Sequence, residues 1–125
     1  MIVYYIVHMT LFGSYLRESR ERLRQIDRSY SLRQVAKRIG VEPAYLSKIE
    51  RGDVAPPSEV TTVKLAQELG EDPDVLLAMA RKVSSDLQEI IRKRPQLFAE
   101  LIRQCKEAPD HAVLKVVREV RDGDW

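Results

Sequence analysis

Apolar residues recur at helical spacing along residues 31–52, where the pattern is most regular. Two apolar sets lie three and four residues apart, as on the buried faces of two helices: Leu32, Val35, Ala36 and Ile39, then Leu46 and Ile49. Gly40 and Val41 fall in the break, where a tight turn is expected because glycine tolerates positive φ. Pro43 suits the first turn of the second helix. The pattern predicts two short helices joined by a turn.

The same periodicity predicts three more helices around this pair, and the five together are expected to form a domain that ends near Val83. Their expected extents are about Leu11 to Gln25, Ser58 (the N-cap) to about Leu69, and Asp72-Pro73 onward. The side chains expected to face inward are Phe12, Tyr15, Leu16, Leu23, Val60, Val63, Leu65, Ala66, Leu69, Val75, Leu76 and Met79.

Residues 84–125 carry three short amphipathic patterns beyond this domain, opened by Ser85, Pro95 and Pro109. Such helices have little core of their own, so they must pack on the domain, on a second copy or on another protein. Cys105 lies at helical spacing within the second pattern and is expected to be a buried thiol. We expect a helical C-terminal extension for dimerisation or partner binding.

Residues 1–8, MIVYYIVH, are apolar and uncharged. They are too short to span a membrane and lack the basic start of a signal peptide. We favour an extension upstream of a start at Met9; the alternative is a β-prone arm that pairs with a partner chain. The expected division is therefore an extension at 1–8, a domain at 9–83 and a helical extension at 84–125.

Composition narrows the possible classes. The chain has 125 residues, of which 32% are charged and 6% aromatic, with five glycines and six prolines. This profile is typical of a helical protein with one small domain and an appendage. The single cysteine excludes an intramolecular disulfide and a Cys-based zinc site. No apolar run approaches the roughly 20 residues that a membrane span needs, so we expect a cytoplasmic location without membrane contact.

The net charge of +2 conceals an asymmetry along the chain. Residues 14–52 hold 10 Lys/Arg and 5 Asp/Glu, a net charge of +5, whereas residues 53–125 hold 11 and 14, a net charge of −3. Positive charge is thus concentrated around the helix pair, as phosphate contact requires. An ordinary solvated surface is the alternative explanation when charge is considered alone.

The helix pair resembles the helix-turn-helix of the phage repressor and Cro-like transcription regulators. The resemblance rests on small Ala36, the turn Gly40-Val41 and the run Leu46-Ser47-Lys48-Ile49-Glu50-Arg51-Gly52, and continues through Pro57, Ala66, Leu69 and Gly70 to Leu76-Leu77. It covers about half of the chain. It implies an all-α fold, a five-helix repressor-like DNA-binding domain with a helical C-terminal extension. The second helix of the pair would read the major groove.

The resemblance also implies which side chains meet DNA. Lys48 is the expected base reader, as a donor to guanine O6 or N7, and Ala44 can touch a thymine methyl group. Arg51 is expected to hold a phosphate, although an ordinary solvated helix surface is the alternative for both cations. Glu42 departs from the family pattern: it is a poor N-cap and phosphate repels it, but it can accept from a cytosine amino group. The expected DNA-binding residues are Ser31, Arg33, Glu42, Pro43, Ala44, Tyr45, Ser47, Lys48, Arg51 and Ser58.

Two further departures shift the expected phosphate contacts. Many relatives carry Gln where this chain has Leu32, so Ser31 and Arg33 are expected to supply that contact. The loop after the reading helix holds Asp53 and no basic residue, so minor-groove contact is not expected from it. Backbone amides near Ser58, at a helix N-terminus, remain available to phosphate.

A buried ion pair between the first and third helices is also implied by the resemblance, with Arg20 and Glu50 at the matching positions. Such a pair fixes the angle of the reading helix more than it adds stability. The interval from Arg20 to Ser31 is about five residues longer than usual in the family. Either the first helix is longer by a turn or the loop is larger, and Arg24 is an alternative partner.

The leading hypothesis is a sequence-specific, dimeric DNA-binding regulator acting as a repressor, because this family binds two half-sites about one helical turn apart. The alternative is an antitoxin-type module whose C-terminal helices neutralise a protein partner and whose DNA binding serves autoregulation. An enzyme is not favoured, since the chain lacks a Gly-rich phosphate loop, a His/Cys/Asp cluster and nucleophile–base spacing. The expected partners are double-stranded DNA and a second copy of the chain, with no metal or other cofactor.

Overall fold

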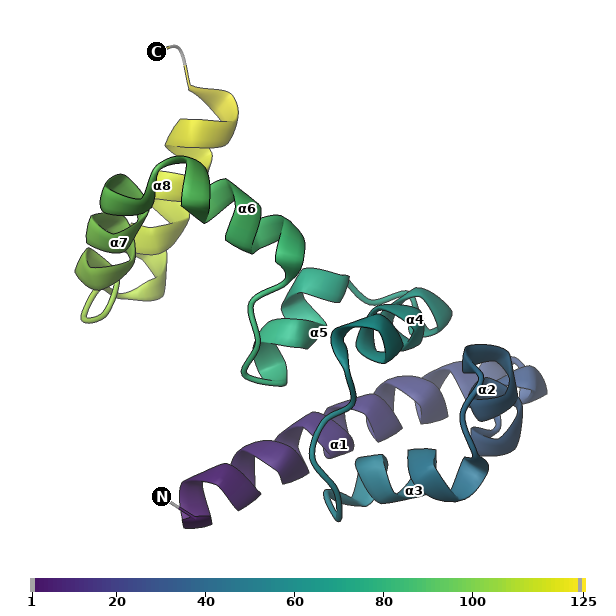
Figure 1. Cartoon of the computed structure of the whole chain (residues 1–125). Coiled ribbons are helices and arrows are strands. Elements are labelled where there is room, and N and C mark those ends of the chain that lie inside the picture. Colours follow the sequence, from purple (N-terminus) through teal and green to yellow (C-terminus); the bar gives the residue numbers. More distant parts are fainter. Residues whose placement is uncertain (1, 124) are drawn as a thin grey trace. The chain divides into compact units, whose positions relative to one another are not determined.

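The computed structural model describes the backbone of residues 2–123 and 125, and the side chains of residues 11–123 and 125. All regular elements in this part of the chain are helical (Figure 1), which confirms the predicted all-α class. The chain divides into two compact units, the first ending at Ser85 and the second beginning at Asp86.

The first unit contains the helix pair and its neighbours. Its elements are α1 Ile2–Ile26, the short 3-10 helix η1 Arg28–Tyr30, α2 Leu32–Ile39, α3 Pro43–Arg51, α4 Glu59–Leu69 and α5 Pro73–Met79. The remaining helices are α6 Ser85–Lys93, which begins at the boundary, α7 Pro95–Gln104 and α8 Asp110–Asp122.

Local sequence sets the ends of the central helices. The Ser31 side chain accepts a hydrogen bond from the Gln34 backbone N–H at 3.3 Å, and Ser58 accepts one from Thr61 at 3.3 Å. Each therefore satisfies a donor that the first turn of a helix leaves unpaired. Gly40 ends α2 with a φ of 78°, a conformation that a Cβ atom disfavours. These predicted caps and the predicted stop are confirmed.

The core of the first unit is shared by all five of its α-helices. Helix α1 packs on α3, α2 packs on α3 and α4, and α4 packs on α5. The buried apolar residues in this core are Phe12, Leu16, Val35, Ala36, Ile39, Leu46, Ile49, Leu65, Ala66, Leu69, Leu76 and Ala80. Because α3 contacts both α1 and α2, its orientation depends on both.

Two positions of the predicted core are wrong. Val60 and Val75 are 65% and 52% exposed, whereas Thr62 and Leu77 are fully buried. Helix α5 has only seven residues, so its inward face is set by packing on α4 rather than by a repeated pattern. Periodicity alone does not resolve the face of so short a helix.

Helix α1 begins well before the predicted start near Leu11. Residues 2–8 continue this helix, so the strand considered for them is wrong. The backbone there follows α1 without a break, whereas a strand would require an extended conformation. Met1 lies outside the described residues, and the division at residue 8 stays a prediction.

A polar contact joins α1 to the turn between α4 and α5. The Ser19 and Tyr15 hydroxyl groups donate to the two oxygens of the Glu71 carboxylate, at 2.6 Å and 2.7 Å. These hydrogen bonds hold the pKa of Glu71 below its ordinary value because they stabilise the charged form. The same contact raises the pKa of Tyr15. These hydrogen bonds connect α1 to the segment between α4 and α5.

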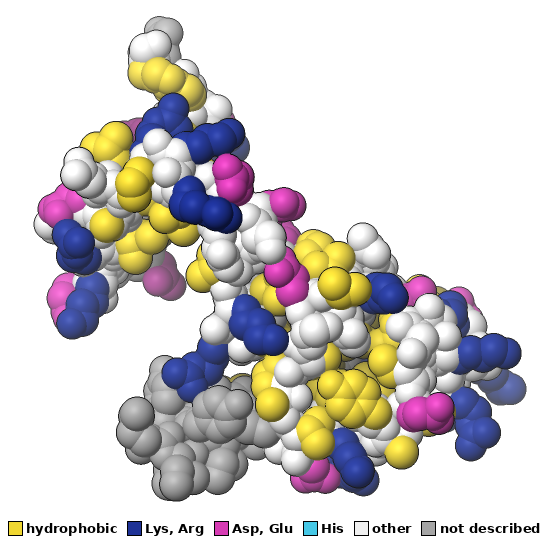
Figure 2. All heavy atoms as spheres, viewed as in Figure 1, with side chains coloured by type: hydrophobic (Ala, Val, Ile, Leu, Met, Phe, Trp, Pro, Cys, Tyr) yellow, Lys and Arg dark blue, Asp and Glu magenta, His cyan; other side chains and the backbone are white. Residues whose placement is uncertain are grey.

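The second unit has amphipathic helices but no buried residue in α6, α7 or α8. Figure 2 shows apolar side chains among the charged ones at its surface. The largest exposed apolar residues in these helices are Leu87, Ile90, Leu97, Leu101, Ile102, Leu114, Val116, Val117 and Val120. Cys105 follows the last turn of α7 and is partly exposed, so its predicted burial is wrong. One chain alone leaves the second unit without a closed core.

Candidate nucleic-acid interface

Helix α3 is buried on one face and exposed on the other. Leu46, Ile49 and Glu50 are buried, which confirms the inward orientation predicted for the two apolar residues. The exposed residues of the helix are Ala44, Tyr45, Lys48 and Arg51, with Pro43 and Ser47 half-buried. Residues 44, 48 and 51 are spaced by four and three, so they share one face. All six predicted contacts on this helix therefore keep some exposure.

A buried ion pair holds α3 against α1. Arg20 donates from Nε to Glu50 Oε2 at 2.7 Å and from Nη2 to Glu50 Oε1 at 3.0 Å. Both residues are under 8% exposed, and the two parallel bonds fix the angle between the planar groups. The hydrogen bonds that Arg20 donates to Glu50 raise the pKa of Arg20 above its ordinary value. Of the two predicted partners of Glu50, Arg20 is the one that forms the ion pair. The Nη1 atom of Arg24 instead lies 3.6 Å from Glu21 Oε1.

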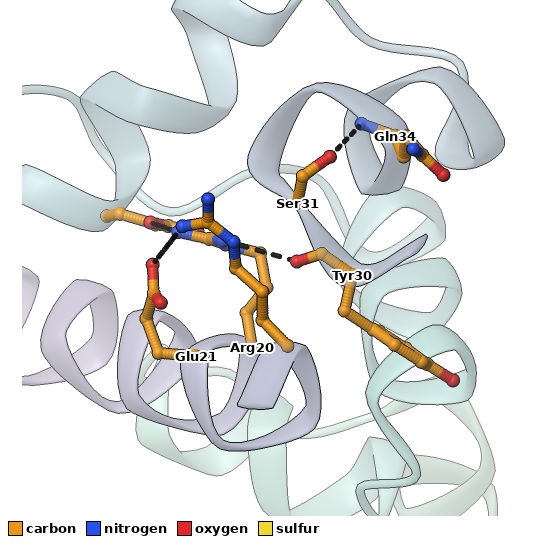
Figure 3. A network of polar contacts seen from close by, with 7 residues as sticks. Arg20, Glu21, Tyr30, Ser31 and Gln34 are labelled. Atoms are coloured by element: carbon orange, nitrogen blue, oxygen red, sulfur yellow. Dashed lines mark hydrogen bonds and ion pairs between the residues drawn. The ribbon is translucent and has the colours of Figure 1, made fainter. Parts of the chain in front are cut away.

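The same guanidinium also holds the loop before α2. Figure 3 shows Arg20 between Glu21 and the Tyr30 backbone carbonyl, which accept hydrogen bonds at 3.1 Å and 3.2 Å. The interval between α1 and α2 contains η1, and the buried Arg20 guanidinium holds the carbonyl of its last residue. Arg20 of α1 binds both Glu50 of α3 and the carbonyl of Tyr30 in η1. It therefore links α1, α3 and the segment before α2.

Arg38 restrains the loop from its other side. It donates to the Ser29 carbonyl at 2.7 Å and to Glu68 of α4 at 2.6 Å. Its guanidinium carbon lies 5.3 Å from the centre of the Tyr30 ring, within the range of a cation–π contact. The contact with Glu68 is not evident from residue spacing, because the two residues lie 30 positions apart.

The N-terminus of α2 presents Ser31 and Arg33. The Ser31 oxygen accepts from the Gln34 backbone N–H, which leaves its O–H free to donate to a phosphate. Arg33 is exposed and has no ion-pair partner among the described residues. The phosphate contact expected from these two side chains stays a prediction.

Glu42 and Ser58 are the N-cap residues of α3 and α4, and only Ser58 makes a side-chain capping bond. Glu42 precedes α3, is exposed and makes no side-chain capping bond. The Ser58 hydroxyl is already shared between the N–H and the hydroxyl of Thr61. The Ser58 hydroxyl is thus used within the chain, and phosphate contact by the backbone amides near Ser58 stays a prediction.

Arg51 lies at the end of α3 in contact with an acidic neighbour. Its Nε lies 2.9 Å from Asp53 Oδ2, and both side chains are about 55% exposed. The residue predicted to hold a phosphate is thus ion-paired within its own chain. By contrast, Lys48 on the same face has no ion pair in the part of the chain that has described side chains.

Gly13 permits the close approach of α1 to α3. A Cβ atom at this position would lie within 2.6 Å of the Glu50 carbonyl oxygen and closer still to that of Ile49. Both are backbone atoms, which cannot rotate away. The apolar pattern alone does not indicate this role of Gly13, although an isolated glycine within a helical pattern is a signal of close packing.

A surface depression of about 520 Å³ is lined by residues of α1 and α3. Its lining is mixed in charge, with Ser14, Arg17, Glu18, Glu21, Glu50 and Arg51. Among the described residues, no group of three or more His, Cys, Asp or Glu is placed to hold a metal ion. No helix in the same part of the chain is long and apolar enough to cross a membrane.

Two helices joined by a tight turn, each with one face buried in the core and the second with a solvent-exposed opposite face, define a helix-turn-helix domain. A family model described as a helix-turn-helix domain matches residues 11–79. The chain belongs to this family, which confirms the predicted resemblance to Cro-like helix-turn-helix regulators. Neither the curated proteins nor the solved structures contain a match.

Proposed function

We propose that this protein is a sequence-specific DNA-binding regulator that acts as a dimeric repressor and reads the major groove with α3. The observation that carries the proposal is the exposed face of α3, with Lys48 at its centre, on a helix held by the buried Arg20–Glu50 pair. A reading helix must keep one angle in the groove, and a bidentate buried pair supplies that rigidity. The net charge of +5 on residues 14–52 supports the same function through phosphate attraction.

Lys48→Ala is expected to cost about 1–3 kcal/mol of binding free energy on the best site and to relax preference at one base position. The loss on random duplex should be smaller, because a base contact carries sequence information and a phosphate contact does not. Binding-site selection identifies the best site. Fluorescence anisotropy at one fixed salt concentration then measures the affinity for this site and for random duplex. Lys115→Ala, an exposed lysine of α8, is the matched control. Equal losses on specific and random DNA would remove Lys48 from base reading.

The second unit is proposed to hold the dimer. Its three helices expose apolar faces, and a second copy would cover them with the same surface. Residues 86–125 hold eight Lys/Arg and eight Asp/Glu, so like-charge repulsion does not oppose self-association. Two half-sites on DNA also require two reading helices at a fixed spacing.

A chain that ends at Ser85 is expected to fold, to be a monomer and to bind a two-fold symmetric site much more weakly than the full chain. It keeps the whole core of the first unit and the hydrogen bonds of Ser85 to Glu59 at 2.7 Å and 2.8 Å. Sedimentation gives the oligomeric state, and circular dichroism provides the control for folding. If the shortened chain stays a tight dimer, the dimer contacts lie in the first unit instead.

The exposed apolar faces of α6 to α8 also support a second function, an antitoxin-type module that binds a different protein. The same sedimentation measurement on the full chain separates the two. A full chain that remains monomeric at micromolar concentration would favour a foreign partner on these helices. A stable dimer would favour the repressor.

A further inference from the structure

The end of α3 places a carboxylate beside a cation of the proposed DNA surface. Gly52 takes a left-handed conformation with a φ of 76°, which turns the chain back on the helix. The Asp53 backbone N–H then donates to the Lys48 carbonyl at 2.9 Å, so the start of the loop is fixed. This cap sets the Asp53 side chain next to Arg51, with 2.9 Å between Oδ2 and Nε.

Helix stability does not explain an acidic residue at this position. The C-terminus of a helix carries partial negative charge, which disfavours a nearby carboxylate. An exposed ion pair between long side chains also contributes little to folding, and both of these side chains are about half exposed. The pair therefore points to a role at the surface of α3.

We propose that Asp53 attenuates DNA binding by competing with a phosphate for Arg51. This inference rests on the proposed function, because it requires α3 to lie against DNA. A phosphate oxygen and the Asp53 carboxylate compete for the Arg51 guanidinium, and these two anions repel each other. Binding must weaken or break the ion pair before Arg51 contributes fully. Lys48 and Arg33 have no such competitor among the described side chains, so Asp53 acts on one contact only.

The test is Asp53→Asn, which keeps the shape of the side chain and removes its charge. Binding to both the best duplex and a random duplex should tighten about threefold to fivefold, the size expected for one surface ion pair. The slope of log K against log salt should steepen by up to about one, because Arg51 then releases counterions as a full phosphate contact. Glu107→Gln, with the same charge change in an exposed loop of the second unit, is the matched control.

A double-mutant cycle with Arg51→Ala shows whether Asp53 acts through Arg51. Arg51→Ala should weaken binding to all sequences about tenfold when Asp53→Asn is already present, and only about threefold in the wild type. Unchanged or weaker binding by Asp53→Asn would overturn the proposal, as would an equal gain from Glu107→Gln. An equal effect of Asp53→Asn with and without Arg51 would show general repulsion and also overturn it. A wild-type chain that binds no duplex would reject the proposed function itself, a result distinct from all of these.

Discussion

Arg20→Ala is expected to lower the free energy of unfolding of the first unit by about 3–5 kcal/mol. The substitution leaves the Glu50 carboxylate buried without its two hydrogen bonds, and it also releases the Tyr30 carbonyl. A domain of this size is stable by only about 5–15 kcal/mol, so a large part of its stability is removed. Thermal unfolding followed by circular dichroism should show a fall in Tm of at least about 12 °C.

Two variants separate the buried charge from other effects of losing an arginine. Arg24→Ala removes a neighbouring guanidinium of α1 that is exposed and forms an ion pair with Glu21, and it should change stability by less than about 0.5 kcal/mol. Combining Arg20→Met with Glu50→Leu removes both charges at once and should recover much of the loss. If Arg20→Ala were as stable as Arg24→Ala, the ion pair would not be buried in solution.

The combined variant also tests how the ion pair serves DNA binding. It should fold, yet bind the best site less selectively, since apolar packing holds α3 at a less defined angle than two parallel hydrogen bonds do. Selectivity equal to that of the wild type would show that packing by Leu46 and Ile49 is sufficient to orient the helix.

Gly13→Ala is expected to destabilise the first unit by about 1–3 kcal/mol, the usual cost of an added methyl group in a tightly packed place. Alanine is the better helix former by about 1 kcal/mol, so any net loss must come from the clash with the Ile49 and Glu50 carbonyl oxygens. Helix α3 would have to move away from α1. Chemical denaturation measures the stability, and anisotropy on the best site reports the displaced reading helix.

Ser14→Ala is the matched control for this substitution. It lies next to Gly13 in α1, is only half-buried and adds no atom toward α3. Its effect should stay within about 0.5 kcal/mol. A Gly13→Ala protein that is as stable as Ser14→Ala, or more stable, would show that the two helices have room between them.

The helix pair could be predicted because its signals are local. The apolar spacing, the Ser31 and Ser58 caps and the stop at Gly40 each depend on residues within one or two turns. The same local rules were less reliable at α5, where seven residues left the inward face open and Leu77 rather than Val75 is buried. They also gave no reason to extend α1 back to Ile2.

The arrangement around α3 depended on contacts between distant residues. Two arginines of α1 were possible partners for Glu50, and the turn of the helix decided for Arg20. Arg38 donates hydrogen bonds to Ser29 and to Glu68, which lies 30 positions away. No periodic pattern in the sequence predicts these contacts. The role of Gly13 appears only when α3 lies across it.

By itself, the sequence determined the helical class, the helix-turn-helix and the inward residues Leu46 and Ile49, since periodicity and capping act within a few residues. Only the tertiary structure decided which charges meet. It buried Arg20 rather than Arg24 with Glu50, joined Arg38 to Glu68 and left Lys48 exposed without an ion pair among the described residues. The physical reason is that an ion pair requires two side chains within about 4 Å, and that distance is set by how helices pack and turn.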